Sequence, residues 1–159
     1  MAGQLTKMED VLHEVFEMIE NRGQRGVETG FFELDDMLNG LQKSEMLIVA
    51  ARPSMGKTAF AMNIIEHVSA DSLQPCAVFS LEMSKQQLAQ RMLCSRGQID
   101  AHKLRKGMLQ AHEYAHLANV VGELAKAPIW VDDSAGLTPL DLRAKARRLK
   151  LQHDVKLIM

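Results

Sequence analysis

Between Val49 and Asn63 the chain contains a stretch typical of a phosphate-binding loop, VAARPSMGKTAFAMN. In such a loop, exposed backbone N–H groups and the N-terminus of the following helix hold anionic phosphates. We expect Lys57 to reach the β- and γ-phosphates of a nucleotide and the hydroxyl group of Thr58 to be a ligand of Mg²⁺. Gly56 allows the backbone to approach the phosphates closely, where a side chain would collide.

The loop departs from the usual motif at one position, because Ala51 stands five residues before Gly56 where a glycine is expected. Alanine preserves such a loop wherever the backbone dihedral angles lie within its reach. The Arg52–Pro53 pair also makes this loop stiffer than a glycine-rich one. An apolar stretch at 45–51 reads as a strand before the loop, and a helix follows from Lys57, so the context favours a nucleotide site over a chance motif.

A second candidate for chemistry is Glu82, within FSLEMS at 79–84. It follows a predicted strand, and ligands of open α/β sheets bind at the carboxyl ends of strands. A carboxylate there can orient the water that attacks a γ-phosphate. The residues alone leave an alternative open, in which Glu82 is simply an acid near a helix N-terminus, where it interacts favourably with the helix dipole.

Strands and helices that alternate along the chain must position these groups. We expect strands at 45–51, 76–82, 128–133 and 155–159, and helices at 57–70, 84–96, 109–126 and 138–152, with a short helix and turns within 97–107. Thr138 is a suitable N-cap and Pro139 suits the first helical position. The strands lack alternating polarity, which predicts an α/β fold with a parallel sheet and helices on both faces. Because an apolar strand begins at Val155 and nothing follows it, we expect the chain to be a piece of a longer protein.

The N-terminal segment predicts an amphipathic helix at 5–21, followed by a hinge at 21–26 that contains two glycines. Its apolar positions are Met8, Val11, Leu12, Val15, Phe16 and Ile19. One helix on a hinge cannot bury this stripe by itself, so the stripe must pack either on its own globule or on another chain. We therefore divide the chain into a helix with its hinge at 1–26 and a globular part at 27–159.

The composition narrows the classes of protein. With 19 basic and 20 acidic side chains, a uniformly basic nucleic-acid coat is excluded, although a local basic groove is not. Cys76 and Cys94 lack the spacing of a CxxC motif, which favours reduced thiols in a cytoplasmic protein. The N-terminus has no apolar signal core, and the longest apolar runs are too short to span a bilayer, so we expect no membrane association.

Two motifs have ordinary explanations. The sequence HEYAH at 112–116 matches the HExxH pattern of zinc proteases, but no third ligand is evident and the segment has the apolar face of an ordinary helix. The basic stretch LRAKARRLK at 142–150 could meet nucleic acid, but a solvated helix face is favoured. With five Phe, one Trp and one Tyr, the chain shows no base-stacking platform.

Several of these stretches together resemble the ATPase domain of DnaB-type replicative DNA helicases. They are TGFFELDDMLNGL at 29–41, LIVAARPSMGKTAFAMNI at 47–64, FSLEMS at 79–84, and LRAKARRLK followed by VKLIM at 155–159. The phosphate loop of this family is similar in using alanine at the position of Ala51. The resemblance implies a RecA-like P-loop NTPase fold in which ATP hydrolysis drives 5′-to-3′ movement along single-stranded DNA and unwinding of the duplex. It also implies that residues 5–21 are a linker helix that docks on the neighbouring subunit of a hexameric ring.

The resemblance assigns roles to individual residues. It implies that Glu82 and Lys57 are catalytic, that Thr58 holds Mg²⁺, and that ATP is held by Ser54, Met55, Gly56, Lys57, Thr58, Ala59 and, near the nucleotide, Arg91. The implied partners are single-stranded DNA, further copies of the chain, a primase and a helicase loader.

The resemblance also implies that parts of the machinery are not in this chain: the Walker B aspartate, the DNA-binding loops, the arginine finger and the family's N-terminal domain. Residues 27–159 would then be the N-terminal part of the ATPase domain, and we expect the isolated chain to hydrolyse ATP weakly or not at all. Two alternatives stay open, namely another RecA-like ATPase, such as a recombinase or a clock-type ATPase, and an assembly module that binds nucleotide without catalysis.

Overall fold

The computed structural model describes residues 6–20 and 25–159. Its elements, in chain order, are α1 (Met8–Glu20), α2 (Phe32–Leu38), α3 (Lys57–Glu66), the π-helical turn η1 (His67–Asp71), β1 (Cys76–Phe79), α4 (Lys85–Arg96), α5 (Ala101–Lys106), α6 (Ala111–Leu124), β2 (Ile129–Asp132), α7 (Pro139–His153) and β3 (Leu157–Ile158).

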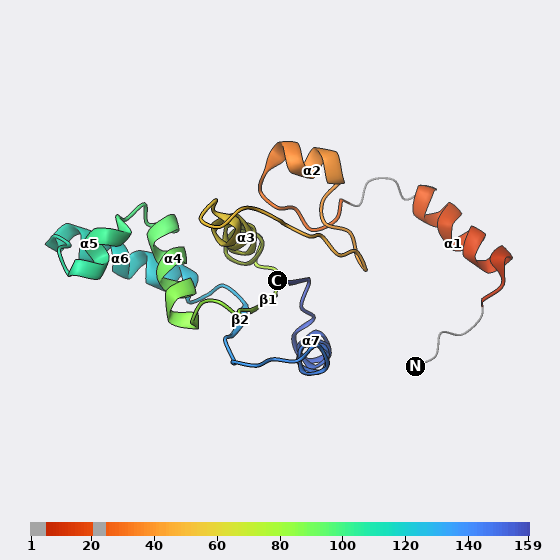
Figure 1. Cartoon of the computed structure of the whole chain (residues 1–159). Coiled ribbons are helices and arrows are strands. Elements are labelled where there is room, and N and C mark those ends of the chain that lie inside the picture. Colours follow the sequence, from red (N-terminus) through yellow and green to blue (C-terminus); the bar gives the residue numbers. More distant parts are fainter. Residues whose placement is uncertain (1–5, 21–24) are drawn as a thin grey trace.

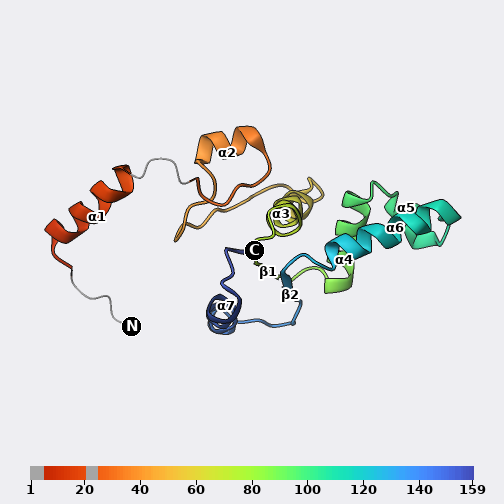
Figure 2. The same ribbon diagram turned by 180° about the vertical axis from the view of Figure 1, so that it is seen from behind.

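A three-stranded parallel sheet lies at the centre of the fold, in the order β2–β1–β3. Cys76 on β1 is in register with Ile129 on β2 and with Leu157 on β3. Helices α3 and α7 lie on opposite sides of this sheet in both views (Figures 1 and 2). The predicted α/β architecture, with a parallel sheet and helices on both faces, is therefore confirmed.

The hydrophobic core lies where α3, η1 and α4 pack against β1. Its buried members are Met62, Ile64, Ile65, Val68, Cys76, Val78, Leu88 and Met92. Because burial of apolar surface is the main favourable term in folding, this cluster fixes α3 and α4 against the same strand. The first turn of α3 and the turn that leaves β1 consequently lie close together.

The strand predicted at 45–51 is wrong for this structure. Residues 46–50 form an irregular segment that pairs with no strand in the described ranges. Met46 is 83% exposed and Ile48 is 76% exposed. An apolar run indicates which surface should be buried, but a strand also needs a neighbouring backbone to complete its hydrogen bonds. Here the sheet ends at β3.

The other predicted elements are present with shifted ends. The helices expected at 84–96, 109–126 and 138–152 are α4, α6 and α7, and the short helix expected within 97–107 is α5. The helix expected at 57–70 changes at Glu66 from α-helix to the π-turn η1. Strands β1, β2 and β3 are all shorter than predicted, because only the paired residues count as strand.

The predicted helix signals act as expected in α7. The side chain of Thr138 accepts a hydrogen bond from the backbone N–H of Asp141, and Pro139 occupies the first turn. At the other end of this helix, the ring of His153 stacks on the indole of Trp130 in β2, with ring centroids 4.3 Å apart. This aromatic contact joins α7 to the sheet.

Helix α2, which was not predicted, is joined to α3 through the residue that precedes it, Phe31. Asp35 is buried and accepts hydrogen bonds from the backbone N–H groups of Thr29 (2.7 Å) and Gly30 (3.1 Å), which fixes the loop before the helix. The ring of Phe31 lies 5.0 Å from the ring of Phe60 in α3. These contacts attach residues 29–38 to the helix that follows the phosphate loop.

Helix α1 forms where an amphipathic helix was predicted, and its apolar stripe faces solvent. Residue 5 and residues 21–24, which hold the predicted start of the helix and most of the hinge, lie outside the described residues. Leu12 is 60% exposed and Phe16 is 59% exposed. Of the two alternatives for this stripe, packing on its own globule is not adopted in this structure, as Figure 2 also shows.

Candidate nucleotide-binding site

The phosphate loop has the backbone of an anion-binding turn. The N–H of Met55 donates to the carbonyl of Arg52 at 3.2 Å, and both Ser54 (φ 65°) and Gly56 (φ 85°) lie in the left-handed region. A Cβ atom added to Gly56 would meet no other atom within 4 Å. Glycine therefore suits this position for its conformation, and the space in front of it is open.

Gly56 is the N-cap of α3, so the first turn of this helix faces that open space. The first N–H groups of an α-helix have no partner within the helix and attract anions together with the helix dipole. Lys57 and Thr58 occupy this first turn, Lys57 exposed and Thr58 half-buried. The residues present thus fit the phosphates of a nucleotide, as the sequence predicts.

Lys57 and Glu82, 25 positions apart in the sequence, are brought together by the fold. The Nζ atom of Lys57 lies 4.0 Å from an Oε atom of Glu82, and the two side chains are 47% and 76% exposed. The N-cap of α4 is Ser84, two residues beyond Glu82. This position supports the role beside the phosphate loop more than the alternative role of a helix-terminal acid.

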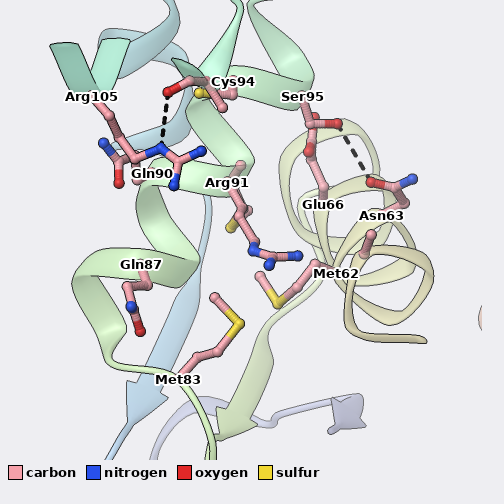
Figure 3. A pocket seen from close by; sticks show the side chains of 13 residues that line it. Met62, Asn63, Glu66, Met83, Gln87, Gln90, Arg91, Cys94, Ser95 and Arg105 are labelled. Atoms are coloured by element: carbon pink, nitrogen blue, oxygen red, sulfur yellow. Dashed lines mark hydrogen bonds between the residues drawn. The ribbon is translucent and has the colours of Figure 1, made fainter. Parts of the chain in front are cut away.

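A pocket of about 490 Å³ opens between α3, α4 and α5. Ala59 and Arg91, two of the residues predicted to bind nucleotide, both line it. Figure 3 shows Arg91 reaching from α4 across the pocket toward Met62 of α3. The pocket reaches the first turn of α3 at Ala59, whereas the other residues predicted to bind nucleotide, at 54–58, are not part of its lining.

An arginine outside the predicted site fastens the walls of this pocket. Arg96 of α4 contacts Glu66 (3.5 Å), Asp71 (2.9 Å) and Glu123 (2.9 Å), which belong to α3, η1 and α6. Burial is the main cause that raises the pKa of Glu66, while Arg96 lowers it. Arg96 therefore holds three helices around one cation.

The carboxyl end of β2 carries two acids that the sequence analysis did not single out. Asp132 accepts hydrogen bonds from Lys145 (2.5 Å) and from the backbone of Ser134 (2.9 Å), and these contacts lower its pKa to about 2. Asp133 accepts a hydrogen bond from the backbone N–H of Lys85 at 3.0 Å. Two adjacent acids at the carboxyl end of a strand, at the edge where Glu82 lies, were the available signal.

The HExxH segment is an ordinary helix in this structure. A ring nitrogen of His116 lies 3.1 Å from the carbonyl oxygen of Gly97, and the carboxylate of Glu113 accepts the backbone N–H of Gln110 at 2.7 Å. In residues 6–20 and 25–159, no three potential metal ligands gather in one place. The basic helix α7 keeps part of its charge in ion pairs, such as Lys150 with Asp154 at 2.7 Å.

Two further features concern the cysteines and the lengths of the helices. Cys76 and Cys94 are both free. None of the helices that the structure describes has the length and the hydropathy needed to cross a bilayer.

A left-handed glycine directly before a helix that begins with Lys-Thr, together with a parallel sheet and an acid just beyond β1, defines the class of P-loop nucleotide-binding proteins. The family follows from comparison with known proteins. Residues 26–159 match the DnaB-like helicase C terminal domain, and the chain belongs to this family.

Similar proteins agree with this assignment. The chain is 44% identical over 163 residues to the replicative DNA helicase DnaB of Geobacillus stearothermophilus. This alignment covers 99% of this chain and 36% of that protein. Among solved structures, the ATPase domain of G40P is similar with a TM-score of 0.86 and 31% identity, over 98% of this chain and 56% of the other. A DnaB-like replicative helicase, studied for its interactions with primase, is similar with a TM-score of 0.85 and 31% identity, over 96% and 38%. The chain thus spans about a third of the length of the curated relative.

Proposed function

We propose that the chain is the ATP-binding part of a cytoplasmic replicative DNA helicase that moves 5′-to-3′ along single-stranded DNA and separates the strands of a duplex. The observation that carries this proposal is the approach of Lys57 and Glu82 to 4.0 Å beside the loop at Gly56. Membership in the DnaB-like family supports the same conclusion. Helicases of this family depend on nucleotide, and we propose ATP with Mg²⁺.

The residues of the loop divide the work of binding the nucleotide. The backbone from Ser54 to Ala59 and the positive end of α3 hold the phosphates. The ammonium group of Lys57 binds the oxygens of the β- and γ-phosphates. The Thr58 hydroxyl would be the ligand of Mg²⁺ from this chain, and the ion would supply neutralisation of charge on the phosphates. The Glu82 carboxylate accepts a proton from the water that attacks the γ-phosphate. Arg91 faces the same region from α4.

The exposed stripe of α1 supports a role in assembly. A helix with large apolar residues on one face and acids on the other is stabilised when its apolar face is buried against another surface. We propose that this surface belongs to a neighbouring copy in a hexameric ring. We further propose single-stranded DNA, a primase and a helicase loader as partners. The similar helicase whose structure was studied for its interactions with primase supports the proposal of a primase as a partner.

Nucleotide binding by the chain itself is the first test. A fluorescent ATP analogue should bind the unsubstituted chain, and Lys57→Ala should weaken binding by roughly 10- to 100-fold, since hydrogen bonds to charged groups contribute about 1.5–3 kcal/mol. Lys43→Ala removes the same charge from an exposed position outside the loop and is the matched control. Equal affinities for the two variants would contradict the proposed site.

Hydrolysis and unwinding require the rest of an ATPase domain. A chimera in which this chain replaces the matching segment of the Geobacillus stearothermophilus helicase supplies it. The chimera should unwind a forked duplex, and Glu82→Gln should lower hydrolysis by on the order of 10²- to 10⁴-fold, as expected for loss of a general base. It should still bind ATP. If the Glu82→Gln chimera turned over at the original rate, Glu82 would not be the base.

A further inference from the structure

The tip of the turn that carries Glu82 is not held in place by burial. Leu81 is 72% exposed, and the side chain of Glu82 is 76% exposed. In the described part of the chain, Glu82 makes an ionic contact with Lys57, and the 4.0 Å between their nitrogen and oxygen atoms is long for an ion pair. A general base must nevertheless stand within hydrogen-bond reach of one particular water. Met83 packs against the core at one end of the turn, so other contacts must fix the exposed residues at its tip.

Ser80 closes the turn from inside. Its hydroxyl group donates to the carbonyl of Met83 at 2.7 Å and accepts from the N–H of Met83 at 3.1 Å, so that Leu81 and Glu82 form the loop between the two ends. The N–H of Ser80 donates to the carbonyl of Asp132 at 2.9 Å. One small side chain thus sets the shape of the turn, while its backbone ties the turn to the end of β2.

Asp133 holds the other side of the turn from 48 residues away in sequence. One of its oxygens accepts the backbone N–H of Lys85, the first residue of α4, at 3.0 Å. Its other oxygen lies 3.6 Å from the ammonium group of the same Lys85. The carboxylate is favoured at this helix N-terminus, and the hydrogen bond from Lys85 lowers the pKa of Asp133.

We propose that Ser80 and Asp133 are positioning residues for Glu82, and that they place its carboxylate without touching the nucleotide. This inference rests on the proposed function, because it takes Glu82 as the base. Residues 80–85 are anchored on both sides to residues at the end of β2, and the exposed carboxylate of Glu82 lies between the two anchors. Misplacement of a reacting group by about 1 Å can lower a rate 10²-fold.

The test uses the same chimera and compares deletion with conservative replacement. Ser80→Ala and Asp133→Ala should each lower kcat by roughly 10- to 100-fold and leave KM and the affinity for the ATP analogue unchanged. Ser80→Thr keeps the hydroxyl group, and Asp133→Asn keeps an oxygen that accepts the N–H of Lys85, so both should recover most of kcat. Thr138→Ala, which removes a comparable hydrogen bond at the start of α7, is the control for a purely structural loss.

The outcomes separate this inference from the function on which it rests. An unchanged kcat in both alanine variants overturns the positioning role while Glu82→Gln still abolishes turnover. Equal losses in the alanine variants and in their conservative partners also overturn it, as does a loss of kcat in the Thr138→Ala control. If Glu82→Gln itself leaves turnover unchanged, the assignment of the base fails first. If Ser80→Ala does not fold, the comparison of Asp133→Ala with Asp133→Asn still tests the positioning of Glu82.

Discussion

The exposed stripe of α1 gives the most demanding prediction, which is that Phe16→Glu breaks self-association of the chain. Phe16 is 59% exposed. A buried Phe covers roughly 200 Å², so docking can remove about 120 Å² of it from water. At about 25 cal/mol per Å² this amounts to roughly 3 kcal/mol, or a factor of about 150 in the dissociation constant.

Light scattering coupled to size-exclusion chromatography, repeated over a range of concentrations, measures this change directly. His13→Glu adds the same charge outside the apolar stripe of the same exposed helix and should leave association unchanged. Binding of the ATP analogue should be equal in both variants, because α1 lies apart from the phosphate loop (Figure 1). Association constants within a factor of two for Phe16→Glu and the unsubstituted chain would refute the reasoning, as would a chain that stays monomeric throughout.

Three other predictions concern the globular part. Gly56→Ala should keep the fold but weaken binding of the ATP analogue about 10-fold. The left-handed conformation costs other residues roughly 1–2 kcal/mol, and a loop that relaxes to avoid this cost would no longer direct its N–H groups at the phosphates. Its melting temperature and the titration together check this, and undiminished affinity would contradict it. The free energy of unfolding that Asp132 contributes should be complete above the ordinary pKa of 3.8 and should disappear as the pH falls through about 2, because the folded pKa is lowered. Urea unfolding of the chain and of Asp132→Asn at several pH values should therefore converge toward the acid end; a constant difference would exclude the linkage. Burial raises the pKa of Cys76 to about 12, so a disulfide reagent at neutral pH should modify Cys94 in the native chain and Cys76 only after unfolding. Rapid reaction of both thiols would show that β1 opens.

Local signals predicted the helices well. Ser84 and Thr138 each cap a helix through their side chains, as residues of this type do, and both helices begin where these residues stand. The phosphate loop was also visible, since its glycine, lysine and threonine act through a turn and one helix terminus that are adjacent in sequence. Such features depend on contacts only a few residues apart.

Features that depend on distant parts of the chain were predicted less well. The apolar run at 46–50 looks like a strand, yet a strand exists only where another backbone pairs with it. Helix α2 depends on the buried carboxylate of Asp35 and on a ring contact with Phe60, neither of which has a periodic signature. For the same reason Asp133 was overlooked, because its partner Lys85 lies 48 residues away.

The stack of His153 on Trp130 has a practical consequence for spectroscopy. The sequence contains one tryptophan, so all of its indole emission comes from this contact between β2 and the end of α7. A change in fluorescence during denaturation therefore reports the loss of that single interface, and nothing directly about α1. Far-ultraviolet circular dichroism, which sums over every helix, provides the complementary signal. If the two transitions coincide, sheet and helices unfold as one cooperative unit.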